Sequence, residues 1–306
     1  MTPPGATATT LLVACAMSRM YLRHVPWGRE WVWNRIVRPH LAWRSLPVRA
    51  RTAFGARLEG RLPDTVHTYV YFFGVWEPTI TAFYRSALRP GDIVVDIGAN
   101  VGLHAMLAAQ LVGPNGRVHA IEASPGIHRR LTRNLATNGI GNVRCYNLAA
   151  TDAVTTVPVY LHDDTNLGGT TIVASEAAKT RAQREATVEG RPLGQIVPPE
   201  ELEAARLIKI DVEGAEWLVA QGMRDLLPRL RPDAEILMEV KPAALEATGG
   251  SLDALLALFA EAGFVPFEIA NAYDGAFYIH PPSARPTPLT RRNFDMADLV
   301  FRRVGS

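Results

Sequence analysis

The chain has 306 residues, 48% of them apolar, and a formal net charge of +2. This length and apolar content suffice for one large α/β domain with additions. A charge so close to zero argues against general affinity for nucleic acid, so no nucleic-acid partner is expected. With only two cysteines, Cys15 and Cys145, a disulfide framework is excluded and a reducing, cytoplasmic setting is favoured.

Residues 1–61 differ from the rest of the chain in charge and aromatic content. They hold ten arginines against two glutamates, and four of the six tryptophans: Trp27, Trp31, Trp33 and Trp43. One interpretation is a helical layer whose tryptophans pack on the main domain while its arginines face water. The other is a surface within residues 18–61 that contacts lipid head groups, on the cytoplasmic face of a membrane, or an acidic partner.

The first 75 residues are predicted to form an extension to the main domain, which would cover residues 76–306. Residues 1–17 are expected to be frayed. The apolar run 9–17 is too short to span a bilayer and lacks the basic start and cleavage site of a signal peptide. Helical pieces broken by prolines are predicted over 18–50. Short β runs over 51–75, ending at 68–73, indicate a small hairpin or cap.

The most informative segment is 91–102 (Gly-Asp-Ile-Val-Val-Asp-Ile-Gly-Ala-Asn-Val-Gly). Residues 93–97 are predicted to form a strand buried on both faces, followed by a turn at Gly98 and a helical pattern from Val101. Glycine lets the backbone approach a ligand closely, and the free N–H groups of a helix's first turn lie nearby. This combination predicts a ligand site.

A tight turn without a ligand is the plainer interpretation of these glycines, but two acids argue against it. Asp96 ends the first strand, and Glu122 ends the next predicted strand, 118–123, at the spacing typical of a ribose-binding acid. The G-x-G-x-x-G fingerprint of dinucleotide folds is absent, so a nicotinamide enzyme is disfavoured.

Strands and helices alternate along the remainder of the domain. A helix is predicted after Trp76-Glu77-Pro78, ending at about residue 88, and further helices at 124–138, 213–223 and 252–262. Strands are predicted at 143–148, 155–161, 206–210, 235–240 and 264–270, with 277–279 and 299–302 as a final antiparallel edge. Residues 162–200 are the least regular part, typical of a lid or a disordered loop. The alternation predicts a doubly wound, mostly parallel α/β sheet with ligands beyond the carboxyl ends of its strands.

That rule brings residues at several strand ends to one rim, four of them acidic: Asp96, Glu122, Ala149, Asp211 and Glu239. Carboxylates are rarely buried unless they are paired, so their joint placement indicates a site rather than packing. Lys209, which alternates within its strand, is expected to pair with one of these acids and not to act in catalysis.

Four segments together resemble the FkbM family of class I S-adenosylmethionine-dependent methyltransferases. They are 95–102, 121–125 (Ile-Glu-Ala-Ser-Pro), 147–152 (Asn-Leu-Ala-Ala-Thr-Asp) and, most specific, 207–216 (Leu-Ile-Lys-Ile-Asp-Val-Glu-Gly-Ala-Glu). The resemblance implies a seven-stranded Rossmann-like sheet, a catalytic domain over 76–306 and S-adenosylmethionine as cofactor. It also implies O-methylation of a hydroxyl on a sugar, glycolipid or natural-product acceptor.

The resemblance further implies which residues hold the cofactor. These are Glu77, Asp96, Gly98, Ala99, Asn100, Gly102, Glu122, Ala123 and Ala149. The turn at 98–102 would wrap the methionine end of the cofactor, Glu122 would bind the ribose hydroxyls, and the backbone near Ala149 would meet the adenine. Asp96 would fix the turn, and Glu77 would border the pocket.

An alcohol acceptor must lose a proton during methyl transfer, so a nearby base would contribute to catalysis. The candidates are Asp211, Glu213, His104 and Glu239, and Asp211 leads because it ends a strand inside the most specific segment. Clustered carboxylates also suit a hard divalent cation, but no ligand spacing requires one, so no metal is predicted. For Glu216 we favour an acidic first turn that stabilises its helix.

Two other functions stay open. One is an N- or carboxyl-directed methyltransferase, including one acting on RNA, which the near-neutral charge and the lack of an Asn-Pro-Pro-Tyr-type motif weaken. The other is a non-catalytic module that binds lipid or a partner through the Arg/Trp-rich start. Metalloprotease and α/β-hydrolase motifs are absent from the sequence, and the sequence does not indicate an oligomeric state.

Overall fold

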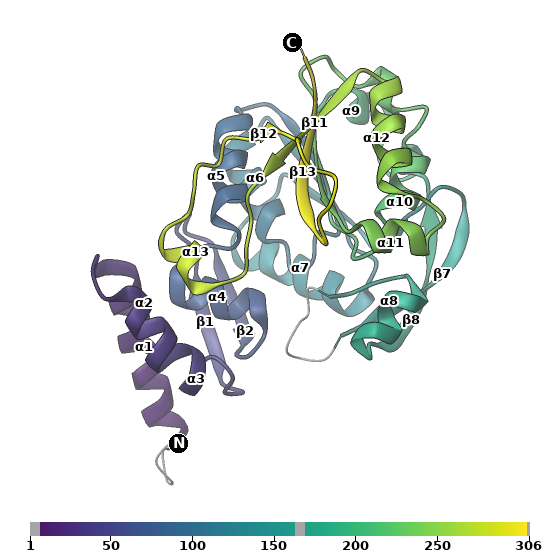
Figure 1. Ribbon diagram of the computed structural model, residues 1–306. Coiled ribbons are helices and arrows are strands. Elements are labelled where there is room, and N and C mark those ends of the chain that lie inside the picture. The colour runs from purple at the N-terminus through teal and green to yellow at the C-terminus, as the bar shows by residue number, and fades with distance from the viewer. Residues whose placement is uncertain (1–6, 163–168, 305–306) are drawn as a thin grey trace.

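Short β-branched segments form one large sheet in the computed structural model, which describes residues 7–162 and 169–304 (Figure 1). Five parallel strands make up most of it: β3 (Ile93–Ile97), β4 (Arg117–Ile121), β5 (Val143–Tyr146), β9 (Ala205–Ile210) and β10 (Glu235–Val240). Beside β10 lie β13 (Ala297–Arg303), β11 (Phe264–Ile269) and the two-residue edge strand β12 (Thr287–Pro288). The order is β12-β11-β13-β10-β9-β3-β4-β5. The predicted mostly parallel, doubly wound sheet is therefore confirmed, with β12 as an eighth, very short strand.

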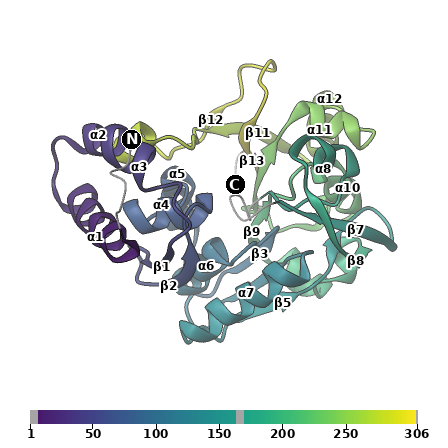
Figure 2. The same ribbon diagram turned by 90° about the horizontal axis from the view of Figure 1, so that it is seen from below.

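Helices cover both faces of the sheet. On one face lie α5 (Pro78–Ala87), α6 (Leu103–Val112) and α7 (Pro125–Thr137), and on the other α9 (Pro199–Glu203), α10 (Glu216–Gly222) and α12 (Leu252–Glu261) (Figure 2; α9 is labelled in Figure 1). Successive residues of a strand point to opposite faces. Val94 accordingly packs in the first core, whereas Val95 and Ile97 pack in the second. Because both faces are buried, the strands read as continuous apolar runs in the sequence.

The final antiparallel part of the sheet differs from the prediction. β13 runs antiparallel to both β10 and β11 and lies between them, inside the sheet rather than at its edge. Residues 277–279, predicted as a strand, belong to the helix α13 (Gly275–Ile279). The Asp274 side chain accepts a hydrogen bond from the Phe277 N–H and caps this helix. The segment is too short for its hydrophobic periodicity to distinguish helix from strand, and the local cap favours the helix.

A separate three-stranded sheet lies beside the main one, formed by β6 (Ala149–Ala150), β7 (Thr155–Leu161) and β8 (Gln183–Arg191). The prediction of β7 is correct as a strand but wrong in placing it in the main sheet. The prediction that 162–200 is irregular is wrong for the described part, which contains α8 (Ala174–Thr180), β8 and α9; residues 163–168 lie outside the described residues. Most β8 side chains are exposed and polar, so its pairing with β7, not its sequence pattern, makes it a strand.

The N-terminal part forms a helical layer and a hairpin. The layer comprises α1 (Ala8–His24), α2 (Arg29–Val32), a π-helical turn (Trp33–Val37) and α3 (Arg38–His40), and the hairpin pairs β1 (Pro47–Arg51) with β2 (Arg57–Arg61). The predicted hairpin is thus confirmed. The prediction of a frayed start is wrong for residues 8–17, because Thr7 caps α1 and Cys15 is buried in the core.

Residues 68–73, predicted as a β run, belong to the helix α4 (Thr65–Phe73). The Asp64 side chain accepts from the His67 N–H at the start, and Gly74 ends the helix in a left-handed conformation. Its aromatic and β-branched residues favour strands only weakly, because context readily overrides β propensity. Here the two caps and nearly complete burial decide for a helix.

The layer is attached to α4 by buried contacts. Trp33 packs its ring 5.5 Å from that of Tyr69 and 4.8 Å from that of Phe73. The Arg23 guanidinium donates to the carbonyl oxygens of Val70 and Tyr71, at 2.5 and 2.8 Å. The layer and one face of the sheet therefore share a continuous core. Among the described helices, none combines the length and apolarity needed to cross a membrane.

Candidate active site

A cavity of about 450 Å³ lies at the carboxyl ends of the parallel strands. Its walls come from the turn after β3, from the ends of β4, β9 and β10, from the starts of α4 and α6, from residues 76 and 77 just before α5, and from residues 169–172 with α8. Every predicted site residue lines it except Asp96 and Gly102. A cavity of this size suits a cofactor or a small ligand.

Gly98 is where the backbone of the turn passes closest to a neighbouring strand end. It has a φ of +79°, and a Cβ added there would lie 1.7 Å from the carbonyl oxygen of Asp211. The N–H groups of Gly98 and Ala99 both donate to the carbonyl oxygen of Ile121. The turn is therefore fixed to the ends of β4 and β9, and only glycine fits this position.

Glu122 anchors the same turn from the end of β4. Its Oε2 accepts from the Asn100 N–H at 2.9 Å and its Oε1 from the Ser124 N–H at 2.8 Å. Burial raises the pKa of Glu122 to about 7. Each carboxylate oxygen has further acceptor capacity, so this side chain, which lines the cavity, can also accept hydrogen bonds from the hydroxyls of a ribose.

Asp96 and Gly102, the two predicted site residues that do not line the cavity, lie in the packed interior around it. Asp96 is almost fully buried, and burial raises its pKa to about 6 although the Lys209 charge opposes the shift. Gly102 has a φ of +90°, and a Cβ there would lie 2.4 Å from Leu131 Cδ1 of α7. Gly102 thus allows the turn to pack on α7, rather than lining the cavity as a residue wrapped around the methionine end would.

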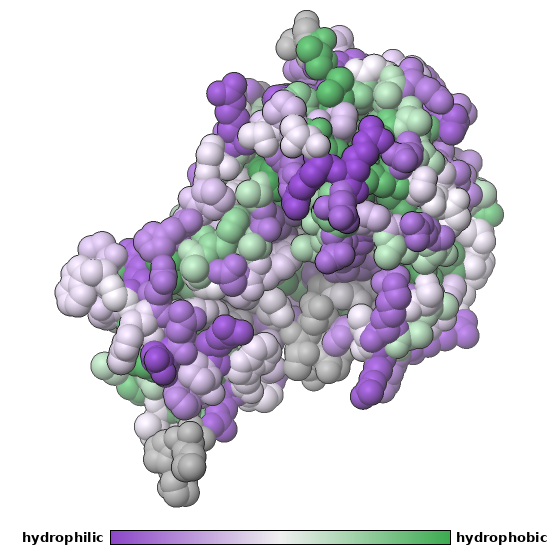
Figure 3. All heavy atoms as spheres, viewed as in Figure 1, coloured by the Kyte–Doolittle hydropathy of each residue, from purple (hydrophilic) through white to green (hydrophobic). Residues whose placement is uncertain are grey.

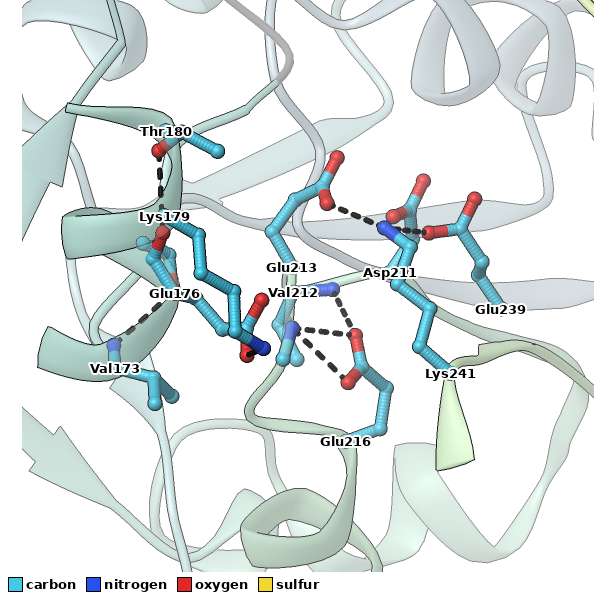
Figure 4. A network of polar contacts seen from close by, with 12 residues as sticks. Val173, Glu176, Lys179, Thr180, Asp211, Val212, Glu213, Glu216, Glu239 and Lys241 are labelled. Carbon is cyan, nitrogen blue, oxygen red and sulfur yellow. Dashed lines mark hydrogen bonds and ion pairs between the residues drawn. The ribbon is translucent and has the colours of Figure 1, made fainter. Parts of the chain in front are cut away.

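Three acids and two lysines form a cluster on one wall of the cavity, and Figure 4 shows the three acids with Lys241. The carboxylates of Asp211, Glu213 and Glu239 offer oxygen atoms that all lie within 4.8 Å of one another. Lys241 Nζ lies 2.7 Å from Glu213 and 2.6 Å from Glu239. Lys209 Nζ donates to Asp211 Oδ2 at 2.7 Å, so the expected pairing of Lys209 with an acid is confirmed.

The two lysines give the acids different proton affinities. Burial opposes ionisation of Asp211, but the charge and hydrogen bond of Lys209 together with the charge of Lys241 lower the pKa of Asp211. Burial raises the pKa of both Glu213 and Glu239 to about 7, despite the opposing charge of Lys241. The cluster therefore combines one firmly ionised carboxylate with two that titrate near neutral pH.

The acids have the spacing of a candidate cation site, but they already have positive partners. Lys209 and Lys241 supply charge at the positions where a hard cation would act. We assign no step to a metal. Glu216 lies next to the cluster, is buried, and accepts from the N–H groups of Val212 and Gly214. It therefore holds the turn that opens α10.

A second buried polar group lies where α5 meets α6. Glu77 has a φ of +45°, and its Oε1 accepts from the Tyr273 hydroxyl at 2.6 Å. Its Oε2 lies 3.3 Å from His104 Nε2. Burial raises the pKa of Glu77 to about 7 and lowers that of His104 to about 3, so His104 is neutral at physiological pH.

Lys241 and Tyr273 are polar lining residues that sequence reasoning did not single out. Lys241 directly follows β10, so the rule that placed Glu239 at the rim also applies to it. Tyr273 lies in the connection between β11 and α13, where no pattern singles it out. It stacks on Trp76 with ring centroids 5.2 Å apart, and both rings line the cavity.

The doubly wound sheet, the glycine turn after β3 and the acid ending β4 define the site of a class I methyltransferase. Comparison with known families agrees. The Methyltransferase FkbM domain matches residues 96–266, which is more than half of the chain. The protein therefore belongs to the FkbM family of S-adenosylmethionine-dependent methyltransferases, and its cofactor is S-adenosylmethionine.

Individual proteins that the chain resembles share less than a third of their residues with it over the matched regions. The chain is 27% identical to the 31-O-demethyl-FK506 methyltransferase FkbM of Streptomyces tacrolimicus over 65% of this chain and 83% of that protein. It is 29% identical to the AMB antimetabolite synthetase AmbE of Pseudomonas aeruginosa, over 58% of this chain but only 10% of that much longer protein. The crystal structure of methyltransferase FkbM from Methylobacillus flagellatus superimposes with a TM-score of 0.42 and 14% identity, over 78% of this chain and 55% of that one.

Proposed function

We propose that this protein is an O-methyltransferase that methylates a hydroxyl group of a sugar, glycolipid or natural-product acceptor. The observation that carries the proposal is the acid cluster, because a hydroxyl acceptor needs a proton acceptor in the same cavity as the cofactor. The name of the Streptomyces relative describes methylation at an oxygen of FK506, which supports an oxygen acceptor here as well.

We propose that the glycine turn and the end of β4 hold the cofactor. Gly98, Ala99 and Asn100 present their backbone to the cavity, and Glu122 offers its carboxylate to the ribose diol. Ala123 and Ala149 line the same wall and would contact the adenine. When bound, the cofactor supplies a methyl group on a positively charged sulfur, so the protein needs chiefly to align the acceptor and exclude water.

We propose Glu239 as the base that takes the hydroxyl proton. Asp211 was the leading candidate from the sequence, but its ion pair with Lys209 lowers its pKa and makes it a weaker base. Glu239 is buried and has a pKa of about 7, which suits a base working near neutral pH. In this scheme Glu213 and Lys241 position Glu239, and neutral His104 and Glu77 border the acceptor.

The stacked rings of Trp76 and Tyr273 support an acceptor that presents a flat or ring-shaped face beside its hydroxyls. The unpaired cysteines Cys15 and Cys145 fit a reducing, cytoplasmic location. An N- or carboxyl-directed transferase would use the same cofactor contacts, and a non-catalytic module would not transfer methyl groups at all. The test below separates these possibilities.

Calorimetry with S-adenosylmethionine tests the cofactor assignment, with Glu122→Ala as the variant. We expect roughly 100-fold weaker binding, because the variant loses two charge-assisted hydrogen bonds to the turn as well as the ribose acceptor. Glu246→Ala, at an exposed acid on α11 (Pro242–Ala247), is the matched control and should bind like the parent. Equal binding by all three proteins would remove Glu122 from the site.

A labelled-methyl assay then tests the reaction. Fractionated lipids, glycans and metabolites serve as acceptors, and base treatment of the product separates labile methyl esters from stable methyl ethers. We expect an ether. A methyl ester or a methylated amine would assign the alternative transferase, and cofactor binding with no labelled product in any fraction would favour the non-catalytic module.

A further inference from the structure

The outward side of the N-terminal layer carries exposed apolar and aromatic side chains. On α1, Val13, Met17 and Met20 are 53 to 67% exposed and recur at helical spacing. They lie opposite the positions that α1 buries, Cys15, Ser18 and Leu22. Three tryptophans of the same layer, Trp27, Trp31 and Trp43, are 62 to 71% exposed. By the apolar face of the layer we mean these six exposed side chains, three on α1, Trp31 on α2, Trp27 in the connection before α2 and Trp43 after α3.

Exposed tryptophans and methionines in such number are unusual on a protein surface. Groups of this kind mark contact sites. The sequence expectation that the tryptophans pack on the main domain is correct for Trp33 alone. Trp33 is buried against α4, whereas the other three project into solvent. Trp33 begins the π-helical turn Trp33–Val37 and is buried, whereas Trp31, two residues earlier, is exposed.

The same region carries a large net positive charge, because its arginines are matched by few acids. Its ten arginines against Glu30 and Glu59 give residues 1–61 a formal charge of +8, so the remaining residues carry −6 of the overall +2. Both glutamates already have partners, Glu30 with His280 and Glu59 with Arg49. In Figure 3 the layer forms the projection at lower left, where purple hydrophilic and green hydrophobic side chains lie close together.

The layer is connected to the active-site cavity through α4. Arg23 and Trp33 hold it to α4, and at the other end of α4 the residues Thr65 and Val66 line the cavity. A nine-residue helix is about 14 Å long. A single helix therefore joins the layer to the wall of the cavity.

We propose that the apolar face and its surrounding arginines dock the protein on the surface of an anionic membrane. Tryptophan and methionine side chains would enter the boundary between head groups and acyl chains, and arginines would pair with lipid phosphates. Positive charge without matching acids fits an anionic surface, and the apolar side chains distinguish a bilayer from a polyanion that offers only charge. The inference concerns the binding surface and does not rest on the proposed reaction.

Vesicle co-sedimentation of the full chain tests this. Vesicles of phosphatidylcholine alone are compared with vesicles containing phosphatidylglycerol, at low and high salt. We expect binding to the anionic vesicles that weakens with salt. Two variants probe the surface: Met17→Ser with Trp27→Ser and Trp31→Ser, and Arg35→Glu with Arg38→Glu. Each should lower the partition coefficient by roughly tenfold or more, given the contribution of each basic residue near the bilayer.

Matched controls lie far along the chain. Val154→Ser removes another exposed apolar side chain, and Arg292→Glu reverses another exposed arginine; both should bind like the parent. Equal thermal midpoints and equal cofactor binding would show that every variant is folded, whatever the outcome of the methyl assay. Failure to sediment with either vesicle would overturn the proposal. A dimer in light scattering that the tryptophan variant converts to a monomer would overturn it too, by assigning the face to a second copy.

Discussion

The rim of the sheet and the N-terminal layer show opposite departures from the usual separation of apolar interior and polar surface. At the rim, Glu122, Glu239 and Lys209 are buried charged groups. In the layer, Trp27 and Trp31 are apolar groups left in water. Buried charge is tolerated where partners or a ligand compensate it, whereas exposed apolar surface is reduced by contact with another body. The first region therefore indicates chemistry within the protein, and the second indicates contact with something outside it.

The largest expected effect tests the chemistry of the rim. Glu239→Gln removes the proposed base while keeping its size, and we expect kcat to fall by about 10² to 10⁴ with cofactor affinity unchanged. A carboxylate base acts only when deprotonated. The parent rate should therefore rise with pH through about 7, the pKa of Glu239, and then level off.

The variant should lose that rising limb, which a pH–rate profile of both proteins would show. Glu246→Gln, at an exposed acid, should keep the parental profile. If Glu239→Gln retained the limb, another group of the cluster would be the base, and Asp211→Asn would be examined next.

The second prediction separates the two kinds of tryptophan in the layer. Trp33→Ala empties a buried site against Tyr69 and Phe73, so we expect the free energy of unfolding to fall by about 3 to 5 kcal/mol. Trp31→Ala, at an exposed position two residues away, should change it by less than about 0.5 kcal/mol. Denaturant titration measures both. Similar losses in the two variants would mean that the exposed tryptophan also packs in the fold.

The third prediction concerns the glycine turn at the rim. Gly98→Ala forces a left-handed alanine whose Cβ meets the Asp211 carbonyl, and we expect a loss of roughly 3 kcal/mol. Gly249→Ala is a matched control, because Gly249 has a similar φ of +84° but no atom within 4 Å of an added Cβ. It should lose only about 1 kcal/mol, the cost of the conformation itself. Thermal unfolding of the two variants compares them, and equal losses would show that the turn can move away from β9.

The sequence by itself determined the sheet and much of the rim. Apolar β-branched runs, glycine turns and helix caps act within a few residues. The strand at 93–97, the Ser124 cap of α7 and the acids at strand ends are therefore legible without tertiary structure. Because parallel strands end at one edge, a local pattern was enough to bring Glu122 and Asp211 to the same cavity.

Tertiary structure alone decided the features that depend on contacts between distant segments. Burial against Trp33 adds to the two caps in making residues 68–73 a helix, and the polar strand β8 exists because β7 pairs with it. Tyr273 reached Glu77 from almost 200 residues away. The buried Trp33 and the exposed Trp31 share one local sequence, and only packing separates them. Such choices are set by long-range contacts, which overrule local propensity whenever the two disagree.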